Sequence, residues 1–214
     1  SALGPLSTDV GDLSPGTTYF YRFYATNADG EAWAPGAAVF LTPSQILFVD
    51  DTAAGADNGT SWTDAYTNLQ QALGAALSNQ QIWVAAGTYP PTNGSDRTAT
   101  FRLRAKIPLH GGFAGGETRL SQRVPATNLA ILSGDLKSND ADGGSESDNC
   151  FHVVTGDDTD PTAILDGFTI TGGTAEGWNA TDLSGGGLVI YRGSPTIIRC
   201  TFRRNRAHYG GALW

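Results

Sequence analysis

The sequence predicts an all-β protein whose longer part is a solenoid of short stacked strands. Three observations lead to this fold class. Short apolar runs recur along most of the chain, Gly-rich corners separate them, and one stretch alone has the periodicity of a helix. Glycine accounts for 28 of the 214 residues, and charged residues make up 16%. This composition suits strands that are joined by tight corners.

Composition also excludes several classes of protein. The net charge of −8 disfavours binding to nucleic acid phosphates, so we expect no nucleic acid partner. No apolar run is long enough to span a membrane. Two cysteines are too few for a disulfide-stapled miniprotein. Cys150 and Cys200 are expected to be buried free thiols, with a disulfide left as the alternative.

Residues 1–43 are predicted to contain strands and no helix. Side chains alternate from Thr18 to Ala25, so Tyr19, Tyr21, Phe23 and Ala25 share one face of a strand. Residues 38–42 form a second predicted strand, and Leu6 to Val10 form a weaker third. Turn signals at 13–17 and 27–30 separate these strands.

Residues 44–81 are predicted to cap the solenoid. A short apolar strand at 46–49 and a polar loop precede an amphipathic helix at about 62–77, with Ser61 as its N-cap. The apolar stripe of this helix contains Trp62, Tyr66, Leu69, Leu73 and Leu77. The open end of a solenoid exposes unpaired backbone groups, and a helix laid over that end would cover them.

Residues 82–214 are predicted to form the rungs. The apolar runs lie at 82–87, 101–113, 129–134, 151–156, 164–173, 186–191 and 196–202. One rung cannot bury its inward face alone, so successive rungs stack. The recurrence of apolar runs and Gly-rich corners continues up to Trp214, and we expect the chain to be an excised piece of a longer protein.

Two segments resemble known families. Residues 13–19, followed by Ala25-Thr26-Asn27 and Gly30, are similar to the end of a fibronectin type III domain, which implies a partial β-sandwich. Residues 46–214 resemble right-handed parallel β-helix proteins of the pectin-lyase-like and polymorphic outer-membrane-protein types. The motifs that carry this resemblance are at 165–173, 185–188, 194–205 and 209–213. The resemblance implies a parallel β-helix and an extracellular or outer-membrane surface location.

An Asp-rich insertion at 135–149 is the candidate metal site. Ser138, Asp140, Asp142, Gly143 and Asn149 fall at the offsets of a calcium-binding loop, although Ser and Asn replace two of its acids. The predicted calcium ligands are Asp135, Asp140, Asp142 and Asp148. The alternative is a solvated acidic insertion between rungs. No other cofactor is expected.

Candidate glycan contacts lie in the last third of the chain. They are Arg199, Arg203, Trp178 and Tyr191, because arginine binds anionic groups and aromatic rings stack on sugars. Arginines on an outward face could equally serve to keep the strands soluble. No catalytic residue is predicted, because the Asp157-Asp158 pair precedes Pro161 in a typical turn sequence.

The predicted function is that of a secreted or cell-surface scaffold, suited to adhesion or to contact with an extracellular polysaccharide or cell-surface glycan. We expect a monomer. The alternative is the N-terminal portion of a polysaccharide lyase or glycoside hydrolase with the pectin-lyase-like fold. That alternative rests on analogy of fold.

Overall fold

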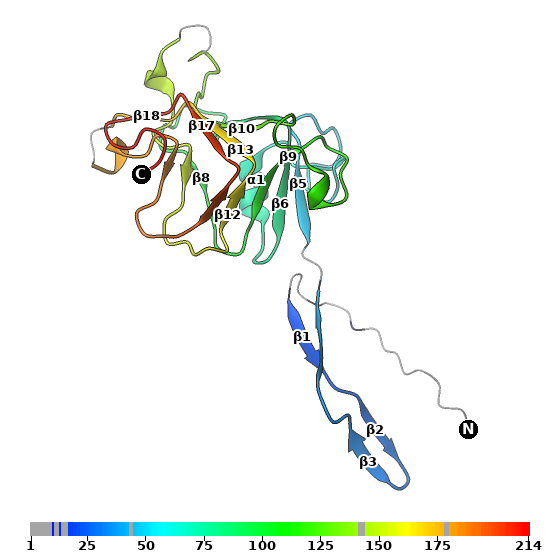
Figure 1. Ribbon diagram of the computed structural model, residues 1–214. Helices are drawn as coiled ribbons and strands as arrows, with labels where there is room; N and C mark the ends of the chain where they lie inside the picture. The colour runs from blue at the N-terminus through cyan, green and yellow to red at the C-terminus, as the bar shows by residue number, and fades with distance from the viewer. Residues whose placement is uncertain (1–9, 11–12, 14–16, 43–44, 141–143, 178–179) are drawn as a thin grey trace. The chain divides into compact units, whose positions relative to one another are not determined.

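The computed structural model describes residues 10, 13, 17–42, 45–140, 144–177 and 180–214. The chain divides into two compact units, Ser1–Gln45 and Ile46–Trp214 (Figure 1). The described residues form a β-rich fold with parallel sheets and a single α-helix. This much of the predicted fold class is confirmed.

Two antiparallel strand pairs make up the described part of the first unit. The pairs are β1 (Thr18–Tyr21) with β4 (Ala38–Leu41), and β2 (Tyr24–Asn27) with β3 (Gly30–Trp33). The turn between β2 and β3 forms because the Asn27 side chain accepts a hydrogen bond from the backbone N–H of Asp29 at 2.9 Å. Most side chains on these strands are exposed. Of the weaker predicted strand, all but Val10 lies outside the described residues.

The second unit contains three main parallel sheets. In each sheet, every strand is hydrogen-bonded to the next one named. The five-stranded sheet contains β16 (Thr196–Ile198), β12 (Ile164–Asp166), β9 (Leu109–Phe113), β6 (Gln81–Ala85) and β5 (Ile46–Val49). The four-stranded sheet contains β17 (Thr201–Arg203), β13 (Phe168–Thr171), β10 (Ala130–Ser133) and β7 (Gly87–Tyr89), and the three-stranded sheet contains β15 (Leu188–Val189), β11 (Val154–Thr155) and β8 (Phe101–Arg102). A short parallel pair, β14 (Thr174–Ala175) and β18 (Arg206–Ala207), accompanies them. Successive passes of the chain visit the main sheets in the same order, so each strand pairs with the strand of the previous pass.

The core of the second unit is built from columns of residues at equivalent positions in successive strands. Leu47, Ile82, Leu109 and Leu165 are aligned across β5, β6, β9 and β12, and each is at most 7% exposed. Burying one such side chain stabilises the fold by about 1.5–3 kcal/mol. These columns hold the passes in register, because a shift by one residue would turn every apolar side chain outward.

The α-helix is shorter than the sequence predicts. α1 spans Leu69–Ala75, and its N-cap is Asn68, whose side chain accepts a hydrogen bond from the backbone N–H of Gln70 at 2.7 Å. The expectation of a helix at about 62–77, capped by Ser61, is therefore wrong at both ends. Ser61 instead donates its hydroxyl to the carboxylate of Asp64.

Polar side chains explain why the helix begins late. Asp64 accepts a hydrogen bond from the backbone N–H of Ala56 at 2.9 Å, and Asp57 accepts one from the backbone N–H of Thr67 at 2.8 Å. These bonds give the backbone of residues 55–67 an alternative to helical hydrogen bonding. At the other end, the Gln80 side chain accepts a hydrogen bond from the backbone N–H of Leu77 at 2.7 Å, and the Leu77 side chain is 65% exposed.

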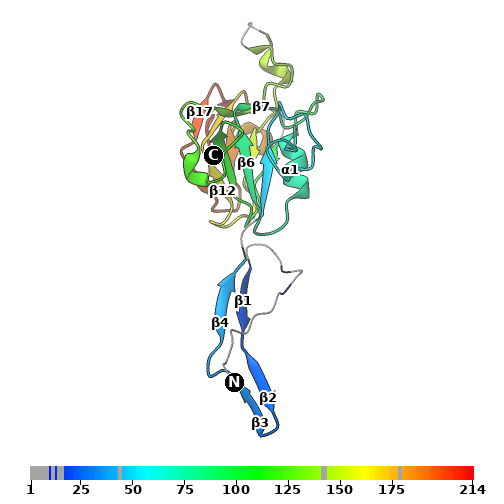
Figure 2. The same ribbon diagram turned by 90° about the vertical axis from the view of Figure 1, so that its right-hand side faces the viewer.

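The outer edge of β5 is covered by this loop. The backbone N–H of Phe48 donates to the carbonyl of Gly59 at 3.0 Å, and the N–H of Tyr66 donates to the carbonyl of Phe48 at 2.9 Å. The bonds satisfy groups that an edge strand would otherwise leave open. α1 lies beside β5 and β6 with Leu69 and Leu73 buried (Figure 2).

A second apolar layer covers the outer face of the five-stranded sheet. The Trp83 ring stacks on Phe113 with centroids 4.6 Å apart, and Trp62 contacts both Phe113 and Phe48. The indole N–H of Trp62 donates to the carbonyl of Glu117 at 2.8 Å. Trp62, predicted on the helix stripe, thus packs against the sheet and holds the segment that follows β9.

The two cysteines of the second unit are free thiols. Cys150 is fully buried, and its burial raises the pKa of the thiol to about 12. A thiol with so high a pKa is a poor nucleophile. Among the described residues, no helix is both long and apolar enough to cross a bilayer.

We expect Leu165→Ala to lower the free energy of unfolding by about 2–5 kcal/mol, because it leaves a cavity in the column of buried residues. Leu77→Ala is the matched control and should change stability by no more than about 0.5 kcal/mol, since Leu77 is exposed. Urea unfolding of the two variants measures the difference. Equal losses in both would contradict the assignment of Leu165 to the core.

Candidate functional site

The most unusual group of polar side chains lies on the outer face of the five-stranded sheet. Parallel pairing aligns His110 of β9 with Asp166 of β12, and Asp166 with Ile198 of β16. Leu109 and Leu165, the preceding residues, point into the core. Because side chains alternate along a strand, His110 and Asp166 face the opposite side.

Asp166 is the centre of this group. Its side chain is 3% exposed and accepts hydrogen bonds from Nε and Nη2 of Arg199 at 2.8 and 2.6 Å. Nη2 of Arg123 donates to the same carboxylate. Nδ1 of His110 lies 3.3 Å from Oδ2 of Asp166. One buried carboxylate therefore holds two guanidinium groups and an imidazole.

The pKa values of Asp166 and His110 each result from opposing effects of burial and neighbouring charged groups. Burial alone would raise the pKa of Asp166, but hydrogen bonds from Arg199 and Arg123 outweigh it and hold the pKa below its usual range. Burial lowers the pKa of His110, and the charge of Arg123 lowers it further, against the attraction of Asp166. His110 is therefore neutral at neutral pH, and the group carries two positive charges against one negative.

Arg123 reaches Asp166 from the segment that follows β9. This segment contains the 3-10 helix η1 (Leu120–Gln122), and the Gln122 side chain accepts a backbone hydrogen bond from Arg119 at 2.8 Å. The Arg123 side chain is 6% exposed, and its Nη1 donates to the carbonyls of Gly111 and Asp166 at 3.0 and 3.1 Å. These bonds fix the guanidinium against the sheet.

Gly167 makes this approach possible. Its φ of +84° bends the chain between β12 and β13, a conformation that favours glycine. A Cβ atom at this position would lie 2.9 Å from the carbonyl oxygen of Gly111 and 3.0 Å from Nη1 of Arg123. Any larger residue would push Arg123 away from Asp166.

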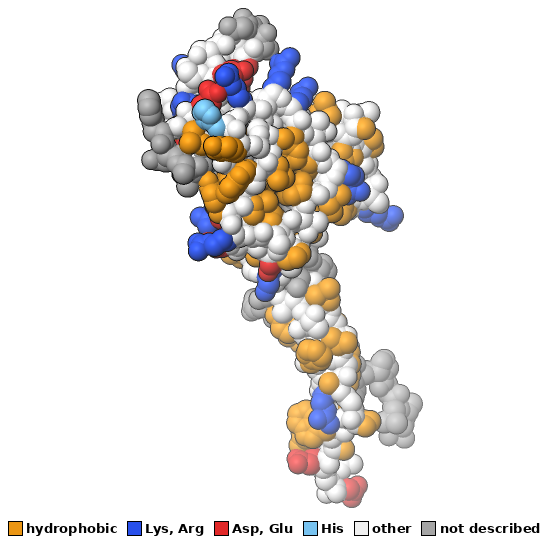
Figure 3. All heavy atoms as spheres, turned by 60° about the vertical axis from the view of Figure 1, so that its left-hand side comes forward, with side chains coloured by type: hydrophobic (Ala, Val, Ile, Leu, Met, Phe, Trp, Pro, Cys, Tyr) orange, Lys and Arg blue, Asp and Glu red, His pale blue; other side chains and the backbone are white. Residues whose placement is uncertain are grey.

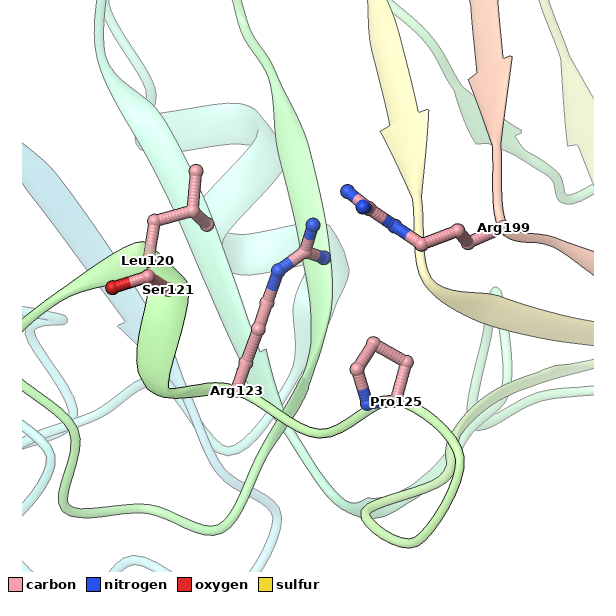
Figure 4. Close-up of a pocket in the computed structure, with 5 residues that line it drawn as sticks. All are labelled: Leu120, Ser121, Arg123, Pro125 and Arg199. Atoms are coloured by element: carbon pink, nitrogen blue, oxygen red, sulfur yellow. The ribbon is translucent and has the colours of Figure 1, made fainter.

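The two arginines border a pocket at the surface. Its volume is about 390 Å³, and Leu120, Ser121, Arg123, Pro125 and Arg199 line it. Figure 4 shows the guanidinium groups of Arg123 and Arg199 approaching each other, while the Ser121 hydroxyl is directed away from them. The side chain of Arg199 is 59% exposed, and within the described residues its Nη1 has no hydrogen-bond acceptor.

Arg199 adopts a strained backbone conformation. Its φ is +49°, a left-handed value that is uncommon for a residue other than glycine. Such strain is found where the surrounding structure imposes a particular side-chain direction. Here the two bonds to Asp166 hold the guanidinium at the pocket.

The structure places the predicted glycan contacts in separate regions. Arg199 lines the pocket. Arg203 lies at the exposed end of β17, in a different sheet. The ring of Tyr191 packs against the ring of Trp214, with centroids 4.9 Å apart. Trp178 lies outside the described residues.

Figure 3 shows the face of the second unit near the end of the chain. Hydrophobic side chains reach the surface there, and the visible Lys and Arg side chains lie mainly toward its edges. The exposed apolar residues of the last pass include Tyr191, Tyr209, Leu213 and Trp214. Tyr191, the predicted glycan contact among them, does not line the pocket.

Sequence reasoning missed Arg123, His110 and Asp166 as members of the site. One signal could have indicated Asp166, because it is an acid within an apolar strand, between Leu165 and Gly167. A charge at such a position needs a partner. Arg123 carries no comparable signal, since it lies in a polar segment far along the chain from Asp166.

The Asp-rich insertion forms a separate site candidate between β10 and β11. Asp135 accepts hydrogen bonds from the backbone N–H groups of Asn139 and Asp140 at 3.1 and 3.0 Å. Asp148 lies 3.7 Å from Nζ of Lys137. Asp142 lies outside the described residues. Across the part of the chain that the structure describes, no group of three or more His, Cys, Asp or Glu residues is arranged to hold a metal ion.

Comparison with protein-family models, with curated proteins and with solved structures gives no match for this chain.

We expect Asp166→Asn to lower the free energy of unfolding by about 3–5 kcal/mol at neutral pH, because it leaves the buried Arg123 without its counter-charge. The folded-state pKa of Asp166 lies below its unfolded value of about 3.9. Its stabilisation is therefore full above that pH and is lost as pH falls through the folded-state pKa. The difference between wild type and variant should shrink in acid.

Denaturant unfolding at several pH values measures this difference. Asp158→Asn is the control, because the Asp158 side chain is 61% exposed and pairs with Arg192 at the surface. If the difference in free energy of unfolding between wild type and Asp166→Asn stays constant from neutral to acidic pH, the charge of Asp166 is not what stabilises the site.

Proposed function

We propose that residues 46–214 form a right-handed parallel β-helix that serves as a secreted or cell-surface scaffold. The parallel sheets and the constant order in which each pass visits them support this fold. We also propose that the first unit is the C-terminal part of a fibronectin type III domain. The antiparallel strands and their exposed apolar side chains support this proposal. In a complete β-sandwich, a second sheet covers the apolar side chains of the first.

The proposed role of the scaffold is to contact an acidic polysaccharide or cell-surface glycan. The observation that carries this proposal is the pocket in which Arg123 and Arg199 share the single carboxylate of Asp166. The pair has one positive charge in excess, although the chain as a whole is acidic. A uronate carboxylate matches this charge, since a hydrogen bond from a guanidinium N–H to a carboxylate is charge-assisted.

The geometry gives each side chain a distinct part. Nη1 of Arg199 is the donor available to the ligand. Asp166 holds Arg199 in place, so little side-chain entropy is lost on binding. Leu120 and Pro125 supply apolar surface for the face of a sugar ring.

The alternative function is the N-terminal portion of a polysaccharide lyase or glycoside hydrolase. The pairing of neutral His110 with Asp166 favours it, because such a pair can orient a general base. However, His110 is 7% exposed and does not line the pocket. The hydrogen bonds that Arg199 donates to Asp166 raise the pKa of Arg199, which disfavours loss of its proton. These facts favour binding over catalysis.

Calorimetric titration with an oligogalacturonate tests the proposal, with its methyl-esterified form as the neutral comparison. We expect binding of the acidic form alone and weaker binding at high salt. Arg199→Ala should reduce the affinity by about tenfold to a hundredfold, the effect of losing one charge-assisted hydrogen bond.

Arg192→Ala is the control, because it removes an exposed arginine outside the pocket and should leave the affinity unchanged. Equal binding of the acidic and esterified sugars would contradict a carboxylate site. Release of unsaturated or shortened sugars during the titration would support the enzyme instead.

A further inference from the structure

The insertion between β10 and β11 contains buried oxygen atoms without partners. Of the described residues, those with a buried side-chain nitrogen or oxygen that lacks a hydrogen bond are Asn139, Asp140, Asp148 and Asn149. In each of the four, the unpartnered atom is Oδ1. Buried polar atoms are nearly always hydrogen-bonded, so four such oxygens in one loop require an explanation.

The four side chains lie together. Nδ2 of Asn149 donates to Oδ2 of Asp140 at 2.8 Å, and Nδ2 of Asn139 lies 3.5 Å from Oδ2 of Asp148. Two pairs of consecutive residues therefore face each other across the loop. Asn149 is 1% exposed, and its Nδ2 also lies 3.5 Å from the hydroxyl oxygen of Thr174 in β14. Both of these contacts use the amide nitrogen, so the Oδ1 of Asn149 is buried without a donor.

The loop is held in this shape by bonds that do not use the four oxygens. The carboxylate of Asp135 accepts the backbone N–H groups of Asn139 and Asp140. Nε of Arg97 donates to the backbone carbonyl of Asn149 at 2.6 Å. The insertion extends beyond the end of β10 (Figure 1). The oxygens are thus positioned in advance of any ligand.

The charge around these oxygens is negative. Asp135, Asp140, Glu146 and Asp148 belong to the same insertion. Burial raises the pKa of Asp140, and the charges of the other three acids raise it further. Lys137 contacts Asp148, but its side chain is 64% exposed. Arg206 pairs with Glu146 from β18 at 3.5 Å. Arg97 is the third cation near the loop, through its bond to the carbonyl of Asn149. None of the three donates a hydrogen bond to the four Oδ1 atoms.

We propose that this insertion binds Ca²⁺ through the Oδ1 atoms of Asn139, Asp140, Asp148 and Asn149. Carboxylate and amide oxygens are the ligands that Ca²⁺ takes, and its coordination number of about 6–8 leaves positions for backbone carbonyls or water. A cation would both partner the four oxygens and offset the negative charge. Asp135 is a positioning residue in this site.

This ligand set differs from the one that the sequence predicts. It keeps Asp140 and Asp148 and adds two asparagines, while the carboxylate oxygens of Asp135 are already used by backbone N–H groups. The offsets of a calcium loop with flanking helices do not describe it, because the ligands come from two consecutive pairs. Two acids with two amides also explain why no cluster of three acidic or metal-binding side chains is present among the described residues.

Calorimetric titration of the intact, chelator-treated protein with calcium chloride tests the proposal. We expect one Ca²⁺ per chain, with a Kd of about 10⁻⁴–10⁻³ M or tighter, and a higher melting temperature in Ca²⁺ than in chelator. Asp148→Asn, which keeps the shape and removes one charge, should weaken binding by about tenfold or more.

Two further variants keep the test decisive. Asn139→Ala removes a ligand at a partly exposed position and should also weaken binding if Asp148→Asn proves unstable. Asp158→Asn is the matched control, because it removes an exposed acid outside the insertion and should leave Ca²⁺ affinity unchanged. The absence of both heat and a melting shift at millimolar Ca²⁺ would overturn the proposal, as would equal affinity in the wild type and both ligand variants. Buried water would then account for the four oxygens.

Discussion

The parallel register between β9 and β12, continued by β16, is the constraint on which the rest of the second unit depends. It aligns Leu109 with Leu165 on the inner face and His110 with Asp166 on the outer face. A slip of one residue would bring the carboxylate of Asp166 into the apolar core and expose Leu165. The free energy of burying the inner column therefore also fixes the position of the charged group outside it.

The segments between strands add chemistry to this framework. The segment after β9 brings Arg123 to Asp166, and the insertion after β10 brings the carboxylates and amides of the Ca²⁺ proposal together. Each follows a strand of the same pass and leaves the pairing of the next strand intact. Loops on a rigid scaffold can vary in this way because their length costs little folding free energy.

Local patterns in the sequence predict most strands of the second unit, because apolar runs follow from backbone geometry. In the first unit the alternation from Thr18 to Ala25 predicts one strand, which is wrong, because β1 ends at Tyr21 and β2 begins at Tyr24 with a different partner. The helix is predicted less well. The stripe from Trp62 to Leu77 has helical spacing, but Asp57 and Asp64 bind nearby backbone N–H groups and keep residues 55–67 in turns. Periodicity does not report this competition between side chain and backbone.

The candidate site shows the same limit. Arg199 is predicted from its residue type, because arginine binds anionic groups, whereas its partnership with Asp166 and Arg123 depends on which strands pair across the sheet. Residues so far apart in sequence become neighbours through the pairing of strands and, for Arg123, through the segment that follows β9. In the insertion, acids can be recognised from composition, but the two asparagines acquire meaning only when their oxygens are found buried and unpaired.

A crystal structure of the intact chain with a bound oligogalacturonate tests the central claim most directly, because it reports the register and the ligand together. The account predicts His110 beside Asp166 on the outer face and a sugar carboxylate against Arg199 in the pocket that Ser121 and Arg123 also line. A different strand register, or a carboxylate bound away from Arg199, would contradict it.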